Sequence, residues 1–307
     1  MADREVRRVI ALGFFDGIHI GHAELIKRTR EIAGNIGARP SVLSFDTHPD
    51  VLVKGENVWL INNAAARSEL LERLFGIDDI IYLHFNESVM RMLWTEFAES
   101  MITEIRATHL VVGHDFRFGY RGEGTAGRLA DFCAKRGVGC DIIPKVELDG
   151  ITVSSTYIRS LISEGDIERA NRFLGHPHVL VDTVRYGYKL GRTIGAPTIN
   201  MRFPDGVLIP RYGVYATKVY LEDGAHSAVT NIGVRPTVSG GTAVSVESFI
   251  LDFEGNLYGR QVRVEFFSFL RDEMKFENVE DLQEQIKRDA QATKEYFEGK
   301  AIETGTI

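Results

Sequence analysis

A change in the order of the expected secondary-structure elements near residue 180 restricts the fold of this chain more than any other feature. Before that point, short apolar runs alternate with stretches whose apolar residues recur at helical spacing, as in the run 9–15 and the stretch 22–33. After it, strand-like segments follow one another with glycine and proline between them. The first pattern predicts a parallel sheet covered by helices, and the second predicts an antiparallel barrel or sandwich.

The length of 307 residues favours two domains, at about 150 residues per domain. We expect a doubly wound α/β domain over 1–175 and a strand-rich domain over 176–307. In the first domain, strands are predicted at 9–15, 42–45, 80–85, 110–112 and 140–143, and helices at 22–33, 70–74, 90–105 and 126–135. This domain ends in helical residues 155–174, which a step at 163–166 divides. In the second domain, strands are predicted at 179–185, 214–221, 226–232, 244–253 and 262–269, before an amphipathic helix over 279–297 and a frayed tail over 301–307.

Composition excludes several classes of protein. The 36 Lys and Arg against 43 Asp and Glu give a net charge of −7 without a basic block, which argues against nucleic acid or an anionic membrane as the main partner. Cys133 and Cys140 fit no disulfide framework and no zinc motif, so we expect inert residues of a helix and a strand. The apolar run at the start stops at Asp16, too early for a signal peptide, and no stretch has the length of a membrane helix. We therefore predict a cytoplasmic protein.

The loop after the first predicted strand reads Gly-Phe-Phe-Asp-Gly-Ile-His-Ile-Gly-His over residues 13–22 and leads into a helix. Glycines let the backbone approach a ligand, and the unpaired N–H groups of a helix N-terminus bind phosphate. His19 and His22 are placed to donate to phosphate oxygens as negative charge develops. Alternatively, the two histidines cap the helix or lie in the core. A zinc site with His48 or His84 is disfavoured, because no Cys or acidic ligand stands at metal spacing.

Two further motifs in the first half carry polar groups to expected ligand-binding positions. Residues 113–119, Gly-His-Asp-Phe-Arg-Phe-Gly, follow a later strand at the edge where α/β sheets bind ligands. Residues 153–159, Val-Ser-Ser-Thr-Tyr-Ile-Arg, open a helix with hydroxyls and a guanidinium. A Ser-Ser-Thr segment alone is usually a helix cap. The ordered set of motifs is the stronger signal.

The strand-rich half holds a second set of candidate residues. The glycine-flanked basic loop at 187–192 is suited to hold phosphate by backbone donation. Thr198 and Asn200 stand two residues apart on an extended segment, so both oxygen ligands face one side, as a Mg²⁺ site requires. Glu247 lies in a strand whose alternation turns it inward, where a raised pKa makes a carboxylate a competent base. Taken alone, however, Glu247 is better interpreted as an exposed strand residue, and only the surrounding motifs favour the base.

Together these motifs resemble the bacterial bifunctional riboflavin kinase/FAD synthetase family. In the first half the resemblance rests on the motifs at 13–22, 45–49, 113–119 and 154–159. In the second half it rests on those at 191–200, 213–216, 231–237, 246–247, 257–259 and 270–276. It covers about 9–297. It implies a Rossmann-like nucleotidyltransferase domain with a helical linker, acting as FMN adenylyltransferase over 1–175. It also implies an antiparallel six-stranded barrel closed by a C-terminal helix, acting as riboflavin kinase over 176–307.

The resemblance implies roles for residues of the first domain. His19 and His22 stabilise the α-phosphate of ATP while the FMN phosphate attacks it and pyrophosphate leaves. Ser155, Thr156 and Arg159 hold the β- and γ-phosphates. Asp115 lies near the nucleotide and Phe116 near the flavin. The remaining nucleotide-binding positions are Gly13, Phe15, Asp16 and Gly21. The family often has Arg where this chain has Tyr157, which removes one phosphate contact.

For the second domain the resemblance implies that Thr198 and Asn200 bind Mg²⁺ with ATP. Glu247 takes the proton of the ribityl 5′-hydroxyl as that hydroxyl attacks the γ-phosphate. Gly191 and Arg192 contact phosphate, and Arg271 lies near the flavin. Where the family commonly has Phe-Pro-Thr-Ala-Asn this chain reads Ala-Pro-Thr-Ile-Asn, so Ala196 and Ile199 alter packing or affinity while both metal ligands survive.

The leading hypothesis is a bifunctional enzyme with ATP, riboflavin and FMN as substrates, Mg²⁺ as cofactor, and no nucleic acid or membrane partner. One alternative is an adenylyl- or cytidylyltransferase of another substrate with an idle barrel, against which the intact Pro-Thr-x-Asn and Glu247 argue. Another is a flavin-binding regulatory module without catalysis, in which His19, His22 or Glu247 should be replaced. The sequence indicates no oligomeric state.

Overall fold

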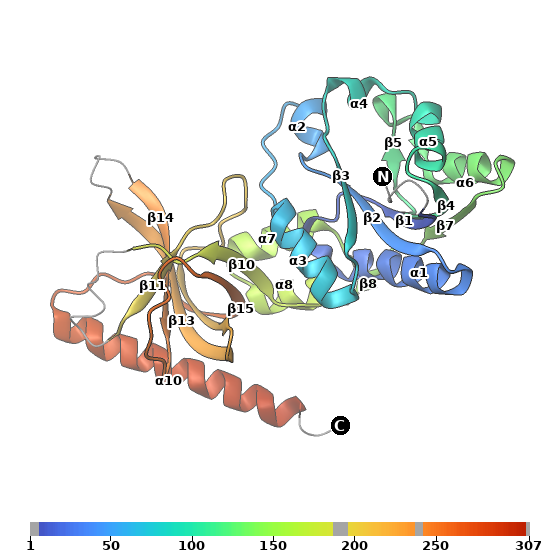
Figure 1. Cartoon of the computed structure of the whole chain (residues 1–307). Helices are drawn as coiled ribbons and strands as arrows, with labels where there is room; N and C mark the ends of the chain where they lie inside the picture. Colours follow the sequence, from blue (N-terminus) through green and yellow to red (C-terminus); the bar gives the residue numbers. More distant parts are fainter. Residues whose placement is uncertain (1–5, 187–195, 237–241, 305–307) are drawn as a thin grey trace. The chain divides into compact units, whose positions relative to one another are not determined.

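The computed structural model describes residues 6–186, 196–236 and 242–304, and the chain divides into two compact units, 1–155 and 156–307 (Figure 1). Helices α7 (Ser155–Glu164) and α8 (Ile167–Leu174) are the two short helices expected on either side of the step at 163–166. Asp166 caps α8 by accepting the N–H of Arg169 at 3.3 Å. Because α8 packs on strands of the second unit, the division between the two units lies before residue 175 in the sequence. The domain boundary at 175 stays a prediction.

The first unit is built on a five-stranded parallel sheet in the order β3-β2-β1-β4-β7, which confirms the doubly wound fold. Its strands are β1 (Arg8–Leu12), β2 (Arg39–Phe45), β3 (Asp79–Leu83), β4 (Ala107–Gly113) and β7 (Gly139–Ile143). Its helices are α1 (Ile20–Ile36), α2 (Pro49–Val53), α3 (Ala64–Phe75), α4 (Glu87–Arg91), α5 (Trp94–Thr103) and α6 (Ala126–Lys135), with 3₁₀ turns at Asp16–Ile18 and Tyr120–Gly122. Two small hairpins join β5 (Arg117–Phe118) to β6 (Gly124–Thr125) and β8 (Glu147–Leu148) to β9 (Ile151–Thr152).

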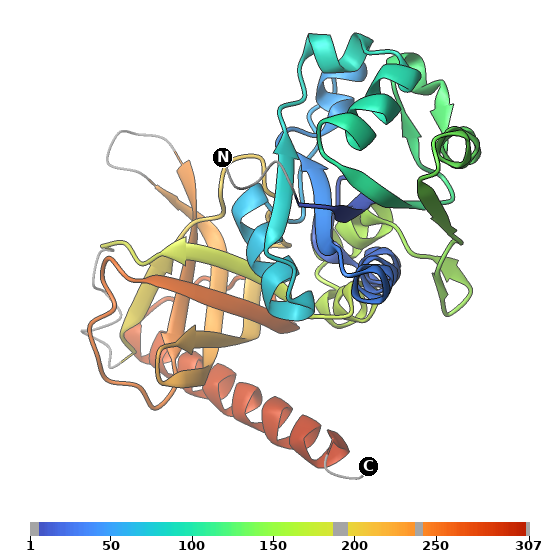
Figure 2. The same ribbon diagram turned by 45° about the vertical axis from the view of Figure 1, so that its right-hand side comes forward.

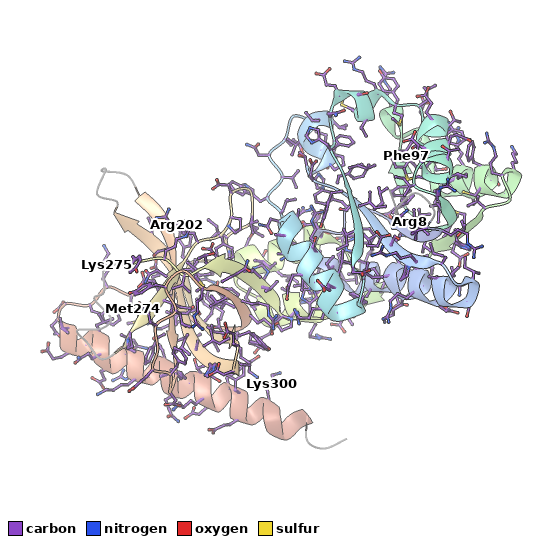
Figure 3. The ribbon with its side chains drawn as sticks, in the orientation of Figure 1. Arg8, Phe97, Arg202, Met274, Lys275 and Lys300 are labelled. Carbon is purple, nitrogen blue, oxygen red and sulfur yellow. The ribbon has the colours of Figure 1, made fainter. Side chains whose placement is uncertain are left out.

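The core of this unit explains its strand pattern. All five residues of β1 are buried, because helices cover both faces of the sheet. Ile10 and Leu12 pack in one cluster with Phe97 of α5, which Figure 3 labels, while α1 lies on the other side of the sheet (Figure 2). Cys133 on α6 and Cys140 on β7 are free thiols in a helix and a strand, as expected.

The single helix predicted over 90–105 is wrong. The chain leaves helix α4 at Arg91 and enters α5 at Trp94, with Met92 and Leu93 extended between them. The N–H of Leu93 donates to Glu96 Oε2 at 3.1 Å, and the carbonyl of Met92 accepts the N–H of Tyr120 at 2.7 Å. These two hydrogen bonds satisfy backbone groups that a continuous helix would pair internally.

The second unit contains a six-stranded antiparallel sheet in the order β10-β15-β12-β13-β14-β11, followed by a long C-terminal helix. The elements are β10 (His178–Thr183), β11 (Thr198–Met201), β12 (Gly213–Leu221), β13 (Gly224–Pro236), β14 (Thr242–Ile250), β15 (Gln261–Arg271) and α10 (Val279–Thr304). A bridge in which the N–H of Arg185 donates to the carbonyl of Asn200 at 2.9 Å joins the two edges of the sheet. The predicted barrel and helix are confirmed, and the helix runs further into the predicted tail than expected.

Buried hydroxyls line one face of this sheet. Thr230 Oγ1 lies 2.7 Å from both Thr217 Oγ1 and Ser248 Oγ, so the three side chains form a hydrogen-bonded row across β12, β13 and β14. Since side chains alternate along a strand, Glu247 and Phe249 on β14 face the opposite side from Ser248. Phe249 packs there with Val229 and with Ala290 of α10. The face that carries Glu247 is therefore the one that α10 covers. No helix within the described residues is long and apolar enough to cross a membrane.

Candidate active sites

The first candidate site lies at the carboxyl ends of the central strands of the first unit. β1 and β4 are neighbours in the sheet although strands β2 and β3 come between them in the chain, so the strand order reverses between β1 and β4. Open α/β sheets bind ligands in the crevice at such a switch point. The loop after β1 carries His19, the first turn of α1 carries His22, and the loop after β4 carries Asp115 and Phe116. The two predicted motifs thus lie at the same edge of the sheet, on either side of the switch point.

The loop after β1 holds an unusual backbone conformation. Phe15 has φ 59° and Ile18 has φ 45°, both in the left-handed region that side chains other than glycine rarely adopt. Asp16 fixes this turn, because its Oδ1 accepts the N–H groups of Ile61 at 2.8 Å and Asn62 at 3.1 Å. Asp16 is 2% exposed, so its carboxylate serves the loop, and its predicted nucleotide contact stays a prediction.

The two histidines of this loop stack on one another. Their ring centroids lie 3.6 Å apart with an angle of 11° between the planes. His19 caps α1, since its Nδ1 accepts the N–H of His22 at 3.2 Å, which realises the capping alternative for that residue. Burial, with added repulsion from His19 and Arg67, holds the pKa of His22 well below its usual value. His22 is therefore neutral at pH 7, and its Nδ1 has no hydrogen-bond partner among the described residues.

Three further residues predicted for this loop shape it from within. Phe15 is 1% exposed and packs its ring 5.0 Å from that of His22, so its side chain supports the loop from within. A Cβ on Gly13 would lie 3.1 Å from the Phe15 ring, and one on Gly21 would lie 3.2 Å from the His19 ring. Both glycines therefore permit close packing of the rings against the loop.

The loop after β4 presents Asp115 to solvent, with its side chain 83% exposed, which leaves the carboxylate free to meet a ligand. Phe116 behaves differently. Its ring stacks on Phe118 at 5.3 Å and packs against the core cluster beneath the sheet edge. A flavin contact by Phe116 would use only the part of the ring that this packing leaves open.

The predicted phosphate-binding residues at 155–159 sit at the start of helix α7. Ser155 Oγ donates to the carbonyl of Asp16 at 2.9 Å, which ties the helix start to the loop after β1. Thr156 and Arg159 follow on the first turns of the same helix. Tyr157, where the family often has Arg, packs edge-on against Phe173 with centroids 5.0 Å apart. Where the family often has Arg, this chain therefore has a tyrosine that packs within the second unit.

The second candidate site lies on β11 and β14. Asn200 and Glu247 are direct partners in the antiparallel register, and Asn231 of β13 is the partner of Glu247 on its other side. Directly paired residues share a face, so the three side chains form a row. Glu247 is 9% exposed, and Ser245 Oγ donates to its Oε1 at 3.4 Å. The interpretation of Glu247 as an exposed strand residue is therefore wrong.

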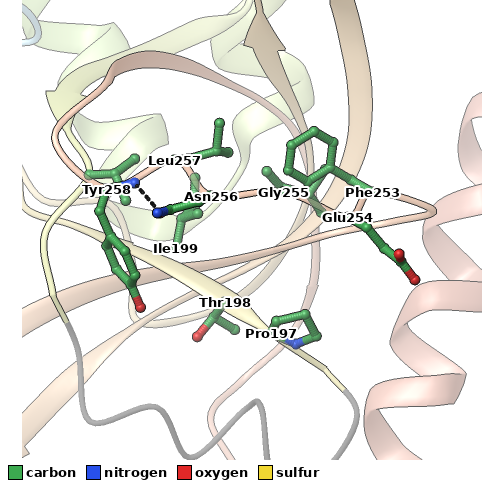
Figure 4. A pocket seen from close by; sticks show the side chains of 11 residues that line it. Pro197, Thr198, Ile199, Phe253, Glu254, Gly255, Asn256, Leu257 and Tyr258 are labelled. Carbon is green, nitrogen blue, oxygen red and sulfur yellow. Dashed lines mark hydrogen bonds between the residues drawn. The ribbon is translucent and has the colours of Figure 1, made fainter.

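Thr198 lies on the same face of β11 as Asn200 and borders a pocket of about 270 Å³ (Figure 4). The pocket lies between the start of β11, where Ile199 also lines it, and the loop that joins β14 to β15. The N–H of Tyr258 donates to Asn256 Oδ1 at 3.1 Å and so shapes that loop, and the Tyr258 ring stacks on Tyr186 at 4.2 Å. A stacked tyrosine pair beside a hydroxyl suits a ligand with an aromatic ring and a phosphate.

A second cavity, of about 470 Å³, separates β14 from α10. Phe249, which shares the face of Glu247, lines it together with Ala196 and Ala290. Arg271 forms an ion pair with Asp289 of α10, in which Nη2 lies 2.7 Å from Oδ2 and Nε lies 3.0 Å from Oδ1. Its position near the flavin stays a prediction. Arg271 thus anchors the helix that closes this cavity. The predicted residues Gly191 and Arg192 lie outside the described residues.

Comparison with known proteins decides the family. A model of the FAD synthetase family matches residues 2–157, and a model of the riboflavin kinase family matches residues 174–297. A bifunctional riboflavin kinase/FMN adenylyltransferase of Listeria monocytogenes is 36% identical over 95% of this chain and 93% of its own length. The chain belongs to the bifunctional riboflavin kinase/FMN adenylyltransferase family.

Other members and one solved structure agree over almost the whole chain. The relative from Pseudomonas fluorescens is 34% identical, over 93% of this chain and 92% of its own. A crystal structure titled as a macrolide-efflux protein from Streptococcus pneumoniae superposes with a TM-score of 0.84 at 31% identity, covering 94% of each chain. The bifunctional fold is therefore matched in both units.

Sequence reasoning missed residues that this family's fold brings to the two sites. Arg67 of α3 is 1% exposed and binds the loop after β1, and Asn231 stands beside Glu247. For Arg67, a cation within the apolar stripe of a helix was the available signal.

Zinc is the alternative that the sequence disfavours for the histidines. His48 caps α2, and His84 Nδ1 lies 2.6 Å from Asp46 Oδ2. No group of three or more His, Cys, Asp or Glu within the described ranges is placed to hold a metal ion.

Proposed function

We propose that the two reactions of this family occur at separate ATP sites, one in each unit of this chain. Riboflavin and ATP give FMN and ADP at the second unit, and FMN and ATP give FAD and pyrophosphate at the first. The nucleotide is the same in both reactions, but the phosphorus atom that is attacked differs. The observation that carries the proposal is the placement of two phosphate-handling clusters in different units: the His19–His22 stack and the Asn200–Glu247 pair.

In the first unit, an oxygen of the FMN phosphate attacks the α-phosphorus of ATP, and the bond from that phosphorus to the bridging oxygen of pyrophosphate breaks. The nucleophile is already an anion, so positioning and charge stabilisation matter more than a base. We assign His19, His22 and the N-terminus of α1 to the developing charge on the α-phosphate. The pyrophosphate contacts of Ser155, Thr156 and Arg159 at the start of α7 stay a prediction. Binding of the triphosphate adds negative charge beside His22 and raises its pKa from the low value that burial imposes.

In the second unit, Glu247 takes the proton of the riboflavin 5′-hydroxyl while the hydroxyl oxygen bonds to the γ-phosphorus and ADP leaves. A carboxylate that is 9% exposed is poorly solvated, which makes it a better proton acceptor than one in water. The cavity between β14 and α10 is large enough for part of a three-ring substrate, on the side of β14 where Glu247 points. We place the nucleotide in the pocket beside Thr198.

Thr198 and Asn200 fit Mg²⁺, because a hydroxyl and a carboxamide oxygen share one face of β11 opposite the carboxylate of Glu247. Mg²⁺ takes few protein ligands and completes its shell with water and substrate phosphates. When bound there, the ion neutralises negative charge on the phosphates of ATP. The two side chains themselves orient the γ-phosphate toward Glu247.

A product assay tests the division of labour. The full-length chain is incubated with riboflavin, ATP and Mg²⁺, and the flavins are separated by chromatography. We expect FMN to appear first and FAD to follow. FMN alone would remove the adenylylation activity from the first unit, and no product would leave a flavin-binding module. Point variants are preferable to a cut at residue 175, since Asn171 of α8 donates to the carbonyl of Phe266 at 2.8 Å and such a cut would strip α8 from the barrel.

A further inference from the structure

Arg67 is the largest of the fully buried side chains in the described part of the molecule. It lies on α3 and is 1% exposed, yet no carboxylate among the described residues is within ion-pair distance of it. Its guanidinium instead binds three neutral oxygens: Nη1 donates to the carbonyl of Phe14 at 2.5 Å and to Ser44 Oγ at 2.8 Å, and Nη2 donates to the carbonyl of Phe45 at 3.0 Å. A buried cation without an anionic partner is expensive, so its presence needs a reason.

The three oxygens lie where two neighbouring strands end. Phe14 stands in the loop after β1, and Phe45 ends β2. Ser44 Oγ also donates to the carbonyl of Phe14 at 2.8 Å, so this one carbonyl accepts from both side chains. The guanidinium in addition lies 4.3 Å from the centre of the Phe14 ring, a cation–π distance. Arg67 therefore contacts both the main chain and the ring of Phe14.

Phe14 directly precedes the strained part of the loop. Phe15 and Ile18 are held in the left-handed region, and such strain persists only where surrounding contacts over-determine the backbone. Asp16 supplies one set of contacts from the far side of the turn. Arg67 supplies the set at its start. The turn ends at His19, whose stack on His22 depends on where the loop delivers it.

The charge of Arg67 reaches the same place. It is one of the three causes that lower the pKa of His22, after burial and the charge of His19. Asp16 and Asp46 attract the guanidinium only over a distance, because neither pairs with it. The crevice beside α1 thus has a fixed positive charge beneath it that no protein carboxylate neutralises at contact.

We propose that Arg67 is a positioning residue for the adenylyl transfer: it holds the loop after β1 in the conformation that presents His19 and His22, and its unneutralised charge attracts the phosphates of ATP. The inference rests on the proposed function of the first unit. It assigns Arg67 two separable effects. The fork of hydrogen bonds sets the position of the histidines, and the charge contributes to binding the anionic nucleotide.

Two substitutions separate these effects. Arg67→Met removes both the hydrogen bonds of the guanidinium and the charge. Arg67→Lys keeps the charge on a side chain that lacks the planar guanidinium group. We expect Arg67→Met to lower kcat of FMN adenylylation about 100-fold, the order of loss that follows a displacement of about 1 Å, and to raise KM for ATP. Arg67→Lys should lower kcat about 10-fold, intermediate between wild type and Met, with KM for ATP near the wild-type value. Loss of folded protein alone would lower apparent kcat in either variant without moving KM.

Arg73 provides a matched control on the same helix. It is an arginine paired with Glu69 at 3.0 Å on the surface and far along α3 from Phe14, so Arg73→Met should leave both parameters within about twofold of wild type. The riboflavin kinase rate of every variant is measured in the same samples, and it should not change. Tryptophan fluorescence reports folding of the first unit, since Trp59 and Trp94 both lie there.

The outcomes are distinguishable. A wild-type protein that forms no FAD would contradict the proposed function itself. Wild-type activity in Arg67→Met, or equal KM values for ATP in the Met and Lys variants, would overturn the inference while leaving the function intact. If Arg67→Met does not fold, Arg67→Lys decides: full wild-type kcat would show that the fork has no positioning role.

Discussion

His178 is a buried base that nothing in its surroundings stabilises in the charged form. It lies on β10 and is completely buried, and its ring stacks with Phe203 at 6.4 Å and tilts against Phe266 at 5.7 Å. Neither ring nitrogen has a hydrogen-bond partner among the described residues. Burial, with repulsion from His176, lowers the pKa of His178 from 6.5 to about 3. The folded second unit therefore excludes a proton that the unfolded chain accepts.

The sign and size of the effect follow from proton linkage. Because the pKa is depressed in the folded state, stability is fully present above pH 6.5 and is lost as the pH falls from 6.5 toward 3. Between pH 7 and pH 5, protonation favours the unfolded state about 25-fold, or about 2 kcal/mol, since the folded state takes up almost no proton in that range. For a unit of about 150 residues this lowers Tm by about 4–8 °C.

Calorimetry of the full-length chain at pH 7 and pH 5 measures this shift. His178→Phe is the matched variant, because it retains an aromatic ring between Phe203 and Phe266 and cannot titrate. The transition of the second unit should shift between the two pH values by about 4–8 °C less in the variant than in wild type. An equal pH shift in both proteins would refute the reasoning, and it would mean that His178 is solvated or hydrogen bonded in solution.

The remaining predictions concern the two sites and the helix that closes the barrel. His22→Ala should reduce FAD formation from FMN by 10³-fold or more and leave FMN formation from riboflavin unchanged in the same assay. Glu247→Gln should do the reverse, and loss of both activities from either change would contradict independent sites. Asp289→Ala leaves Arg271 without its partner on α10, where the two side chains are 7% and 20% exposed, and should destabilise the second unit by about 3 kcal/mol in urea unfolding; a change below about 1 kcal/mol would mean that the ion pair does not anchor the helix.

The architecture was predictable because burial leaves a periodic record in the sequence. All five residues of β1 are buried, and four of them are apolar. Helix α6 begins and ends at the residues that its apolar spacing predicts. The sequence could not predict the bend at Met92, since its carbonyl pairs with Tyr120 in a distant loop. The bridge between Arg185 and Asn200 that joins the barrel edges is equally non-local.

The site residues divide in the same way. Histidines, a carboxylate and a threonine–asparagine pair were identifiable because their side-chain chemistry is suited to phosphate transfer. Their surroundings were not identifiable. The carboxylate of Asp16 binds the N–H groups of Ile61 and Asn62, and its contact with the nucleotide stays a prediction. Arg271 pairs with Asp289, and its position near the flavin stays a prediction. Both side chains bind a partner within the fold. A sequence motif does not predict such a partner, because a backbone N–H group can come from any residue type.

Arg67 shows where this limit lies. Arg67, Leu70, Leu71 and Leu74 recur at the spacing of one helix face, and the first three are buried, so the sequence itself marks a cation among apolar positions. A cation at such a position must find oxygens inside the protein, which makes its burial a usable signal of a built site. The oxygens it finds are the carbonyls of Phe14 and Phe45, and only the pairing of β1 with β2 brings them together. The residue could therefore be singled out from sequence, but its attachment to the catalytic loop required the sheet.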